Sequence, residues 1–466
     1  MFTAAAALRA QLDDIEKSLA ALESQMTSLR AQKERLLTDL DSLKYPVLTL
    51  PNEITVEIFM HFVSLMRQEY YLPQPYHGLL KLASVCQSWR AVTLSTCALW
   101  NDGIEVDCDR ICDAGQLLKV CLPRAGSLPL DLDIQLPAND SFSMDTIIST
   151  LGLYGSQWRN VHLSSLMPWS SSIFPINRFP SFLPLLECLK LSKLQVNDNF
   201  VSSLRHAPQL RELSLPYSSW AIQLGLPFNK LTRLNLVRFS IAQLLAVLPY
   251  TLNLEFLQLA AATQSAQDIP GPPFVLLPHL HTFVCEKDTP TTVLQYLTLP
   301  AVERLVLGHL SVAGVHAIQS CVARSLSTIR TVDLINLDFD AAYNFLCSLP
   351  TIRHLCLSWG WEWSNYDEDF FFDAMISGSC LPVLESLTCK KCQPMKADKL
   401  FPVVLARWRG IEGTTKLNSV SLDFAQDSES DRESDADDHE NVFDRLYELG
   451  RQGLKLEITG APAATR

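Results

Sequence analysis

The sequence predicts a mixed α/β protein in three parts: a long N-terminal coiled-coil helix, a small all-α module and an irregular solenoid of repeats. Three observations lead to this fold class. Apolar residues recur with heptad spacing over residues 1–44. Short helical patterns separated by prolines occupy residues 45–110. One short apolar motif then returns many times over residues 125–426, which indicates a chain of similar stacked units.

Composition narrows the class of protein. The formal net charge is -12, whereas a nucleic-acid partner would require a basic surface, so we expect no nucleic acid. The 13 cysteines are odd in number, and Cys188, Cys285 and Cys356 stand inside apolar strand patterns. This usage is typical of buried, reduced thiols in a cytoplasmic or nuclear protein rather than of a secreted disulfide framework.

Membrane insertion is not predicted. Residues 1–8 are an alanine run too short for a secretory signal. The most apolar later stretch, residues 240–262, contains a proline, an asparagine, a glutamate and several glutamines, which a membrane span of about 20 residues rarely has. We interpret it as a buried helix followed by a strand.

The N-terminal 44 residues have the pattern of a coiled coil. Apolar positions separated alternately by three and four residues continue for five heptads without glycine or proline. Lys33 stands at one of these positions, where it costs stability and can select the register or the number of helices. The helix should therefore pair with a second copy as a homodimer through residues 8–43, with a partner coil, or with its own chain. A helix folded back on the body is the alternative to a coiled coil. The d positions are Leu8, Ile15, Leu22, Leu29, Leu36 and Leu43, and the a positions are Leu12, Leu19, Met26, Lys33 and Leu40.

A short helical module follows over residues 45–110. Pro46 ends the coil, and Pro51 suits the first turn of a new helix, where a missing N–H is no loss. Glu53 places a carboxylate at the positive end of this helix. Ile54, Ile58 and Phe62 then recur every four residues on one face. Further helical segments, rich in leucine and ending in Leu99 and Trp100, complete the module.

The motif apolar-x-x-apolar-x-apolar occurs eleven times after residue 125. The copies begin at Trp158, Leu186, Leu210, Leu231, Leu254, Leu280, Val302, Ile329, Ile352, Leu384 and Leu417. Their mean spacing of about 26 residues lies in the range of roughly 20–29 found in leucine-rich repeats. Each copy alternates like a short strand, and the segments between strands, such as residues 241–248, have helical spacing. Because one unit cannot bury its own apolar face, stacking predicts a leucine-rich-repeat solenoid over residues 125–426.

An acidic run separates the last motif from the C-terminal segment. Residues 427–440 hold eight aspartates and glutamates and one arginine, a composition that predicts a disordered, solvated loop. Residues 441–460 return to a helical pattern over 442–449 and an alternating pattern at Leu454, Leu456 and Ile458. We expect this C-terminal helix and strand to close the solenoid.

Within this module, about residues 45–100 resemble the F-box, and with a heptad helix before them and repeats after them the chain resembles the fungal F-box/leucine-rich-repeat proteins. The resemblance implies docking of the F-box on a Skp-type adaptor of a cullin–RING (SCF-type) ubiquitin ligase, with the repeats binding a protein substrate. It also implies which residues form or support the adaptor-binding face: Leu50, Pro51, Glu53, Ile54, Ile58, Leu82, Val85, Cys86 and Trp89.

An alternative function stays open. The helices could merely cap the first repeat of the solenoid, because terminal repeats need a cover. The protein would then be an interaction scaffold outside any ligase. The predicted loop from Ser64 to Gly78 is longer than is usual in the F-box family, which keeps this alternative alive.

No catalytic constellation is recognisable, so we predict neither an enzyme nor a cofactor. The sequence has no phosphate-binding glycine-lysine loop, no Gly-x-Ser-x-Gly and no His-Glu-x-x-His motif. Cys389 and Cys392 have zinc-ligand spacing, but no second pair follows to complete four ligands. Cys389 also fills the last apolar position of a repeat strand, so we expect a core thiol and no metal site.

The best candidate for substrate contact is an aromatic insertion within a long repeat interval. Trp359, Trp361, Trp363 and Tyr366 follow the strand pattern of residues 352–357. Insertions in solenoids form loops on one face, often the binding face, and tryptophan and tyrosine are strong interface anchors. The alternative is that these rings only pack the insertion against its neighbours.

Overall fold

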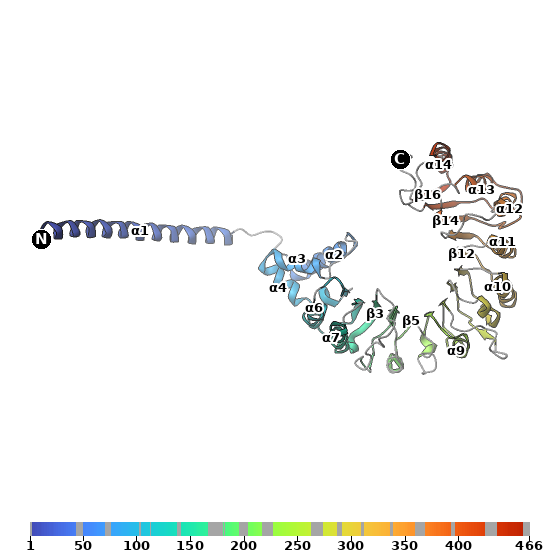
Figure 1. Cartoon of the computed structure of the whole chain (residues 1–466), viewed down its shortest axis with the longest axis horizontal. Coiled ribbons are helices and arrows are strands. Elements are labelled where there is room, and N and C mark those ends of the chain that lie inside the picture. Colours follow the sequence, from blue (N-terminus) through green and yellow to red (C-terminus); the bar gives the residue numbers. More distant parts are fainter. Residues whose placement is uncertain are drawn as a thin grey trace. The chain divides into compact units, whose positions relative to one another are not determined.

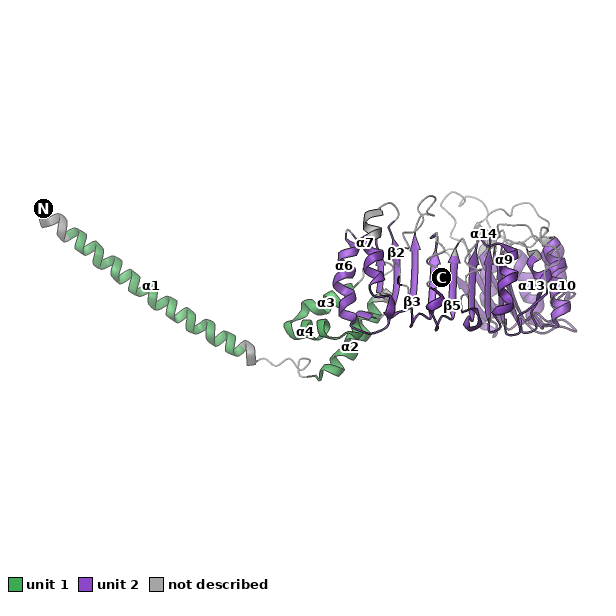
Figure 2. Ribbon diagram, turned by 90° about the horizontal axis from the view of Figure 1, so that it is seen from below, with its two compact units in different colours: residues 1–99 green, residues 100–466 purple. Residues whose placement is uncertain are grey.

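The chain forms two compact units, Met1–Leu99 and Trp100–Arg466 (Figure 2). A computed structural model describes residues 2–42, 50–69, 76–101, 104–111, 113–137, 141–165, 180, 182–194, 204–216, 227–261, 274–286, 291–308, 312–335, 339–358, 369–392, 397–424 and 436–459. The first unit is helical, and the second consists of a large parallel sheet with helices. The chain is therefore a mixed α/β protein, as the sequence predicts.

The first unit begins with a single long helix, α1 (Phe2–Ser42). Its heptad side chains from Leu8 to Leu36 are all between 50% and 65% exposed where they are apolar. The remaining helices are α2 (Asn52–Glu69), α3 (His77–Val85) and α4 (Gln87–Ser95), and α5 (Ala98–Asn101) crosses into the second unit.

The predicted bounds of the loop between Ser64 and Gly78 are both wrong. Helix α2 continues to Glu69, and α3 already begins at His77. The helical pattern of α2 extends because Leu65 and Met66 continue its apolar spacing and no proline or glycine intervenes before Pro73. The connection is thus much shorter than the sequence suggested, and its residues 70–75 lie outside the described residues.

The second unit is built on one parallel sheet, which has 14 strands among the described residues. The strands follow one another across the sheet in chain order, and every neighbouring pair is parallel. A separate two-stranded ribbon pairs β8 (Val275–Leu276) with β10 (Leu297–Thr298). The strands of the large sheet are β1 (Ile104–Asp107), β2 (Leu130–Leu136), β3 (Trp158–Ser165), β4 (Cys188–Ser192), β5 (Glu212–Pro216), β6 (Arg233–Val237), β7 (Phe256–Ala260), β9 (Thr282–Cys285), β11 (Arg304–Leu307), β12 (Thr331–Ile335), β13 (His354–Ser358), β14 (Ser386–Cys392), β15 (Ser419–Phe424) and β16 (Lys455–Thr459).

Each of the eleven motif copies coincides with one strand, from β3 to β15. The C-terminal alternating pattern at Leu454–Ile458 forms β16, which pairs with β15. The array starts earlier than predicted, however. Strand β1 pairs with β2, so residues 104–110 belong to the sheet unit and not to the helical module that was expected to run to 110. The sheet therefore begins before the expected boundary at residue 125.

Two rows of apolar side chains run across the sheet in register. In one row Leu189, Leu213, Leu234 and Leu257 are successive partners, and all are at most 2% exposed. The second row follows two residues later in each strand, because alternate residues of a strand point to the same face. Each strand thus covers the apolar side chains of its neighbours, which explains why one unit alone would be unstable.

Helices lie along one side of this sheet (Figures 1 and 2). The described part of the apolar stretch, residues 240–261, contains a helix and a strand, α9 and β7, as predicted. The α-helices are α6 (Ala114–Cys121), α7 (Ser141–Gly152), α9 (Ile241–Val247), α10 (Val312–Ser325), α11 (Phe339–Cys347), α12 (Asp369–Ser377), α13 (Ala397–Arg409) and α14 (Ala436–Arg451). Short 3-10 helices are η2 (Leu122–Ala125), η3 (Gly155–Gln157), η5 (Leu204–His206), η7 (Phe228–Lys230), η8 (Leu248–Tyr250) and η10 (Thr291–Tyr296).

The acidic run is not a loop throughout. Residues 436–440 form the first turns of α14, so this helix begins before the predicted start at 442. Residues 427–435 of the predicted disordered segment lie outside the described residues.

Candidate functional site

Helix α2 buries one face and exposes another. Phe59 is 1% exposed and Thr55 is also buried, whereas Ile54 is 50% and Ile58 is 46% exposed. Positions 54, 58 and 65 lie on one stripe of the helix, since residues three or four apart are neighbours on its surface. Leu65 is likewise exposed. The helix therefore offers solvent an apolar stripe of two isoleucines and a leucine within the described first unit.

Helices α3 and α4 contribute buried side chains to the helical module and are separated by a single residue, Cys86. Leu79 and Leu82 of α3 are buried, while Val85 at its end is exposed. Cys86 is extended and separates the two helices. Its Sγ accepts a hydrogen bond from the Trp89 backbone N–H at 3.4 Å and so caps α4.

An aromatic pair joins α2 to α4. The rings of Phe59 and Trp89 lie edge to face with centroids 4.9 Å apart, a favourable geometry for two aromatic rings. Trp89 is half-buried. A hydrogen bond also joins α4 to α3: Arg90 Nε donates to the Ala83 carbonyl at 2.8 Å.

The structure divides the predicted adaptor-binding residues into two groups. Leu50, Pro51, Glu53, Ile54, Ile58 and Val85 are exposed and free to contact a partner. Leu82, Cys86 and Trp89 hold the helices together instead. The prediction missed Phe59, the buried centre of α2, and the exposed Leu65. The sequence did contain a signal for Leu65, because a spacing of seven residues places it on the same helix face as Ile58.

Comparison with protein families identifies this module. Residues 47–102 match the F-box-like family model. The chain carries an F-box-like domain. It comprises α2 to α5, and its last residues, including Trp100, belong to the second compact unit. The match is narrower than the predicted module, residues 45–110. No curated protein matches the chain.

F-box domains typically bind Skp-type adaptors within cullin complexes and act as substrate adaptors of SCF-type ligases. The exposed stripe on α2 of this F-box-like domain is therefore the candidate functional site. Its chemistry is that of a docking surface, since aliphatic side chains next to Glu53 can be buried by a partner but cannot catalyse a reaction.

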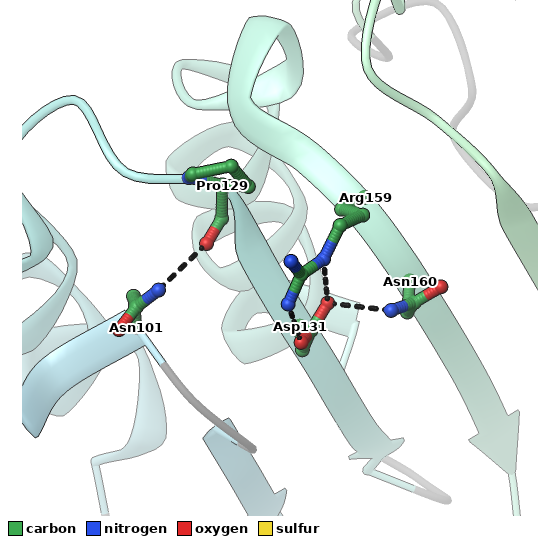
Figure 3. Close-up of polar contacts among 5 residues, drawn as sticks. All are labelled: Asn101, Pro129, Asp131, Arg159 and Asn160. Atoms are coloured by element: carbon green, nitrogen blue, oxygen red, sulfur yellow. Dashed lines mark hydrogen bonds and ion pairs between the residues drawn. The ribbon is translucent and has the colours of Figure 1, made fainter. Parts of the chain in front are cut away.

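The opposite face of the sheet in the second unit carries polar ladders between neighbouring strands. At its N-terminal end, Asp131 accepts hydrogen bonds from Arg159 Nε at 3.0 Å and from Asn160 Nδ2 at 2.8 Å (Figure 3). Asn101 Nδ2 donates to the Pro129 carbonyl at 3.1 Å. The contacts of Asp131 tie β2 to β3 on the face away from the apolar rows, and the Asn101 bond ties the end of α5 to the residue before β2.

The ladder continues with a charged cluster around Glu212. Its carboxylate lies 3.1 Å from Lys190 Nζ and 3.4 Å from Arg233 Nε. Burial raises the pKa of Glu212, but hydrogen bonds from Lys190 and Cys188 and the charges of Lys190 and Arg233 outweigh it and hold the pKa below its ordinary value. Glu212 is therefore ionised at neutral pH.

Cys188 lies beside this carboxylate, so the expectation of buried core thiols is wrong there. Cys188 stands just before the first apolar row and Cys356 stands between the two rows, and both are half-buried, whereas Cys285 is buried as predicted. The Cys188 thiol donates to Glu212 Oε2 at 3.3 Å. Burial, and then the charge of Glu212, raise the pKa of Cys188 to about 12.

This environment predicts slow alkylation of Cys188. At pH 8 only about one Cys188 thiol in 10⁴ would be the reactive thiolate, because its pKa lies four units higher. The rate of iodoacetamide labelling at Cys188, followed by peptide mass spectrometry, should rise about tenfold per pH unit between pH 7 and 10. Glu212→Gln should speed labelling, since it removes the negative charge but keeps Lys190 and Arg233. Fast labelling at pH 7 that ignores Glu212 would contradict this account.

A polar groove crosses the beginnings of four neighbouring strands, β5, β6, β7 and β9, with a volume of about 540 Å³. Its lining has mixed charges, since Arg211, Lys230 and Glu255 all contribute, and Lys230 Nζ donates to the Pro208 carbonyl at 2.7 Å. The balance of charges gives the groove no defined ligand. It is lined by Gln209, Arg211, Lys230, Thr232, Asn253, Glu255, His279 and His281.

The remaining predicted sites have different outcomes. Trp359, Trp361, Trp363 and Tyr366 lie outside the described residues. Cys389 is buried in β14, as a core thiol should be. In the described part of the chain, no group of three or more His, Cys, Asp or Glu side chains could hold a metal ion. Nor does any helix there combine the length and the apolar character needed to span a membrane.

Proposed function

We propose that this protein is the substrate-recognition subunit of an SCF-type ubiquitin ligase and has no catalytic site of its own. The observation that carries the proposal is the exposed apolar stripe of α2 within the F-box-like domain. Ile54 and Ile58 are half-exposed although the same helix has a buried face around Phe59. A Skp-type adaptor that covers this stripe would remove both isoleucines from water, which is the main favourable term in protein association.

In this proposal the second unit is a leucine-rich-repeat solenoid that binds the protein substrate. Its support is the chain-ordered parallel sheet with one strand per motif copy. Such arrays offer extended binding surfaces, because every repeat contributes a strand to the same face. The tryptophan-rich segment at 359–366 is proposed as the substrate contact. The compartment would be the cytoplasm or nucleus, where cullin complexes work.

The test is direct binding of the purified full chain to a purified Skp-type adaptor, followed by addition of the cullin–RING complex. We expect a stable complex with the adaptor and its assembly into the ligase. A folded chain that fails to bind the adaptor, with circular dichroism showing intact helices, would overturn the proposal. The function would then be that of an interaction scaffold, with the F-box-like helices serving as a cap.

A further inference from the structure

The apolar stripe of α1 is an unpartnered surface. Leu12, Leu19 and Met26 at a positions and Ile15 and Leu22 at d positions are each at least half-exposed. A stripe this narrow matches the seam of a coiled coil rather than the wider face of a helix packed on a globular body. The occupant of the seam must therefore be another helix of the same kind.

Charge positions beside the seam distinguish between possible occupants. The e positions hold Arg9, Glu16, Glu23, Arg30 and Leu37, whereas the g positions hold Gln11, Ser18, Gln25, Gln32 and Asp39. Within the described ranges, Lys17 forms an ion pair with Asp13 of the same helix, and this pair lies outside the seam. Glu16, Arg30 and Lys33 are thus available to a partner helix.

A parallel second copy would use these charges poorly. In that arrangement e positions meet g positions of the other helix, so Glu16, Glu23 and Arg30 would all face uncharged Gln or Ser side chains. Lys33 would face Lys33 of the second copy at an a position, which places two ammonium groups together in the seam. Like charges in direct apposition are unfavourable.

An antiparallel second copy uses the same charges well. Full overlap places Leu12 opposite Leu36, Leu19 opposite Leu29 and Met26 opposite Leu22 of the second copy, so apolar a and d positions match. Lys33 then faces Ile15 of the second copy instead of another lysine.

This antiparallel alignment also pairs opposite charges. The e positions of the two helices become neighbours, so Glu16 of one copy approaches Arg30 of the other, twice in each dimer. Glu16 is also close to Lys33 of the second copy. Lys33 lies opposite Ile15, and Glu16 is the next residue, about 1.5 Å further along the helix axis. One like-charge contact remains, Glu23 with Glu23 at the midpoint, where solvent and salt screen it.

We propose that α1 binds α1 of a second copy of this chain as an antiparallel coiled coil. The dimer joins two molecules through their N-terminal helices and is independent of the adaptor-binding role. Glu16 and Arg30 set the orientation, and Lys33 disfavours the parallel alternative.

The test uses charge reversal in the full chain, with the monomer–dimer equilibrium measured by sedimentation at micromolar concentrations. We expect a dimer for the native chain. Glu16→Arg and Arg30→Glu alone should each weaken dimerisation about tenfold, because two attractive pairs become repulsive. The double variant should regain native affinity. An equimolar mixture of the two single variants should form heterodimers, since both pairs are then attractive.

Asp14→Arg is the matched control, because it changes the charge equally at a c position outside the seam. It should leave dimerisation unchanged, and circular dichroism should show α1 intact in every variant. A native chain that stays monomeric would overturn the proposal and assign the seam to a different protein. A dimer that ignores the charge reversals, or single-variant losses without rescue in the double variant, would overturn the antiparallel arrangement.

Discussion

Replacing Ile54 and Ile58 together by aspartate is expected to abolish binding of a Skp-type adaptor while the F-box-like domain stays folded. Both side chains are half-exposed on α2, so two charges there cost little in the free chain. In the complex the same charges would be buried without partners. Hot-spot residues contribute at least about 2 kcal/mol each, so the double variant should weaken binding about 1,000-fold or more. Titration calorimetry with the purified adaptor measures the change.

Met60→Asp is the control for this experiment. Met60 is exposed on the same helix but lies on the flank away from Ile54 and Ile58. This variant should bind the adaptor with near-native affinity. If Met60→Asp lost binding as completely as the double variant, the docking face would have to be moved to the other flank of α2.

Leu213→Asp is expected to unfold the central part of the sheet unit. Leu213 is 1% exposed, and in the sheet it lies between Leu189 and Leu234. A carboxylate at this position would be buried among leucines, which costs more than about 4 kcal/mol unless the region opens. The neighbouring strands β4 and β6 bury their own leucines against this one, so the loss should spread to them. Urea unfolding followed by circular dichroism should give a lower midpoint or an additional transition.

Ser214→Asp separates the effect of burial from that of charge. Ser214 is the next residue in β5 and points to the opposite face, where Lys190 of β4 is its partner in the ladder. The added carboxylate meets a cation there, so stability should change by no more than about 0.5 kcal/mol. Equal destabilisation by both variants would contradict the assignment of the leucine rows to the core.

The sheet was predictable because one local pattern fixes both the strand and its buried face. In β5 and β6 the spacing of Leu213 and Leu215, then Leu234 and Leu236, leaves only one face of each strand apolar. Strands before the first clear motif copy, at Trp158, could not all be predicted from this pattern. Strand β1 is only four residues long, and Ile104 and Val106 alone do not define a repeat.

Helix α2 shows where periodicity fails. Its apolar residues, including Ile54, Ile58, Phe59 and Phe62, surround much of the helix, so spacing alone cannot decide which side is buried. The pairing of Phe59 with Trp89 decides it, and that contact is made between residues 30 positions apart. The length of α2 was underestimated as well, since the predicted loop began at Ser64 and the helix continues to Glu69.

The order of the strands also determines how the protein can fold as it is synthesised. Partner residues in neighbouring strands are separated by only 21 positions, as between Leu213 and Leu234, to 36 positions, as between Val420 and Leu456. Each strand can therefore dock on the preceding strand soon after leaving the ribosome, and no strand waits for a distant C-terminal partner. The growing edge of the sheet is always the newest strand, so besides the outer edge of β1 only this edge of the described sheet offers unpaired backbone groups to other chains.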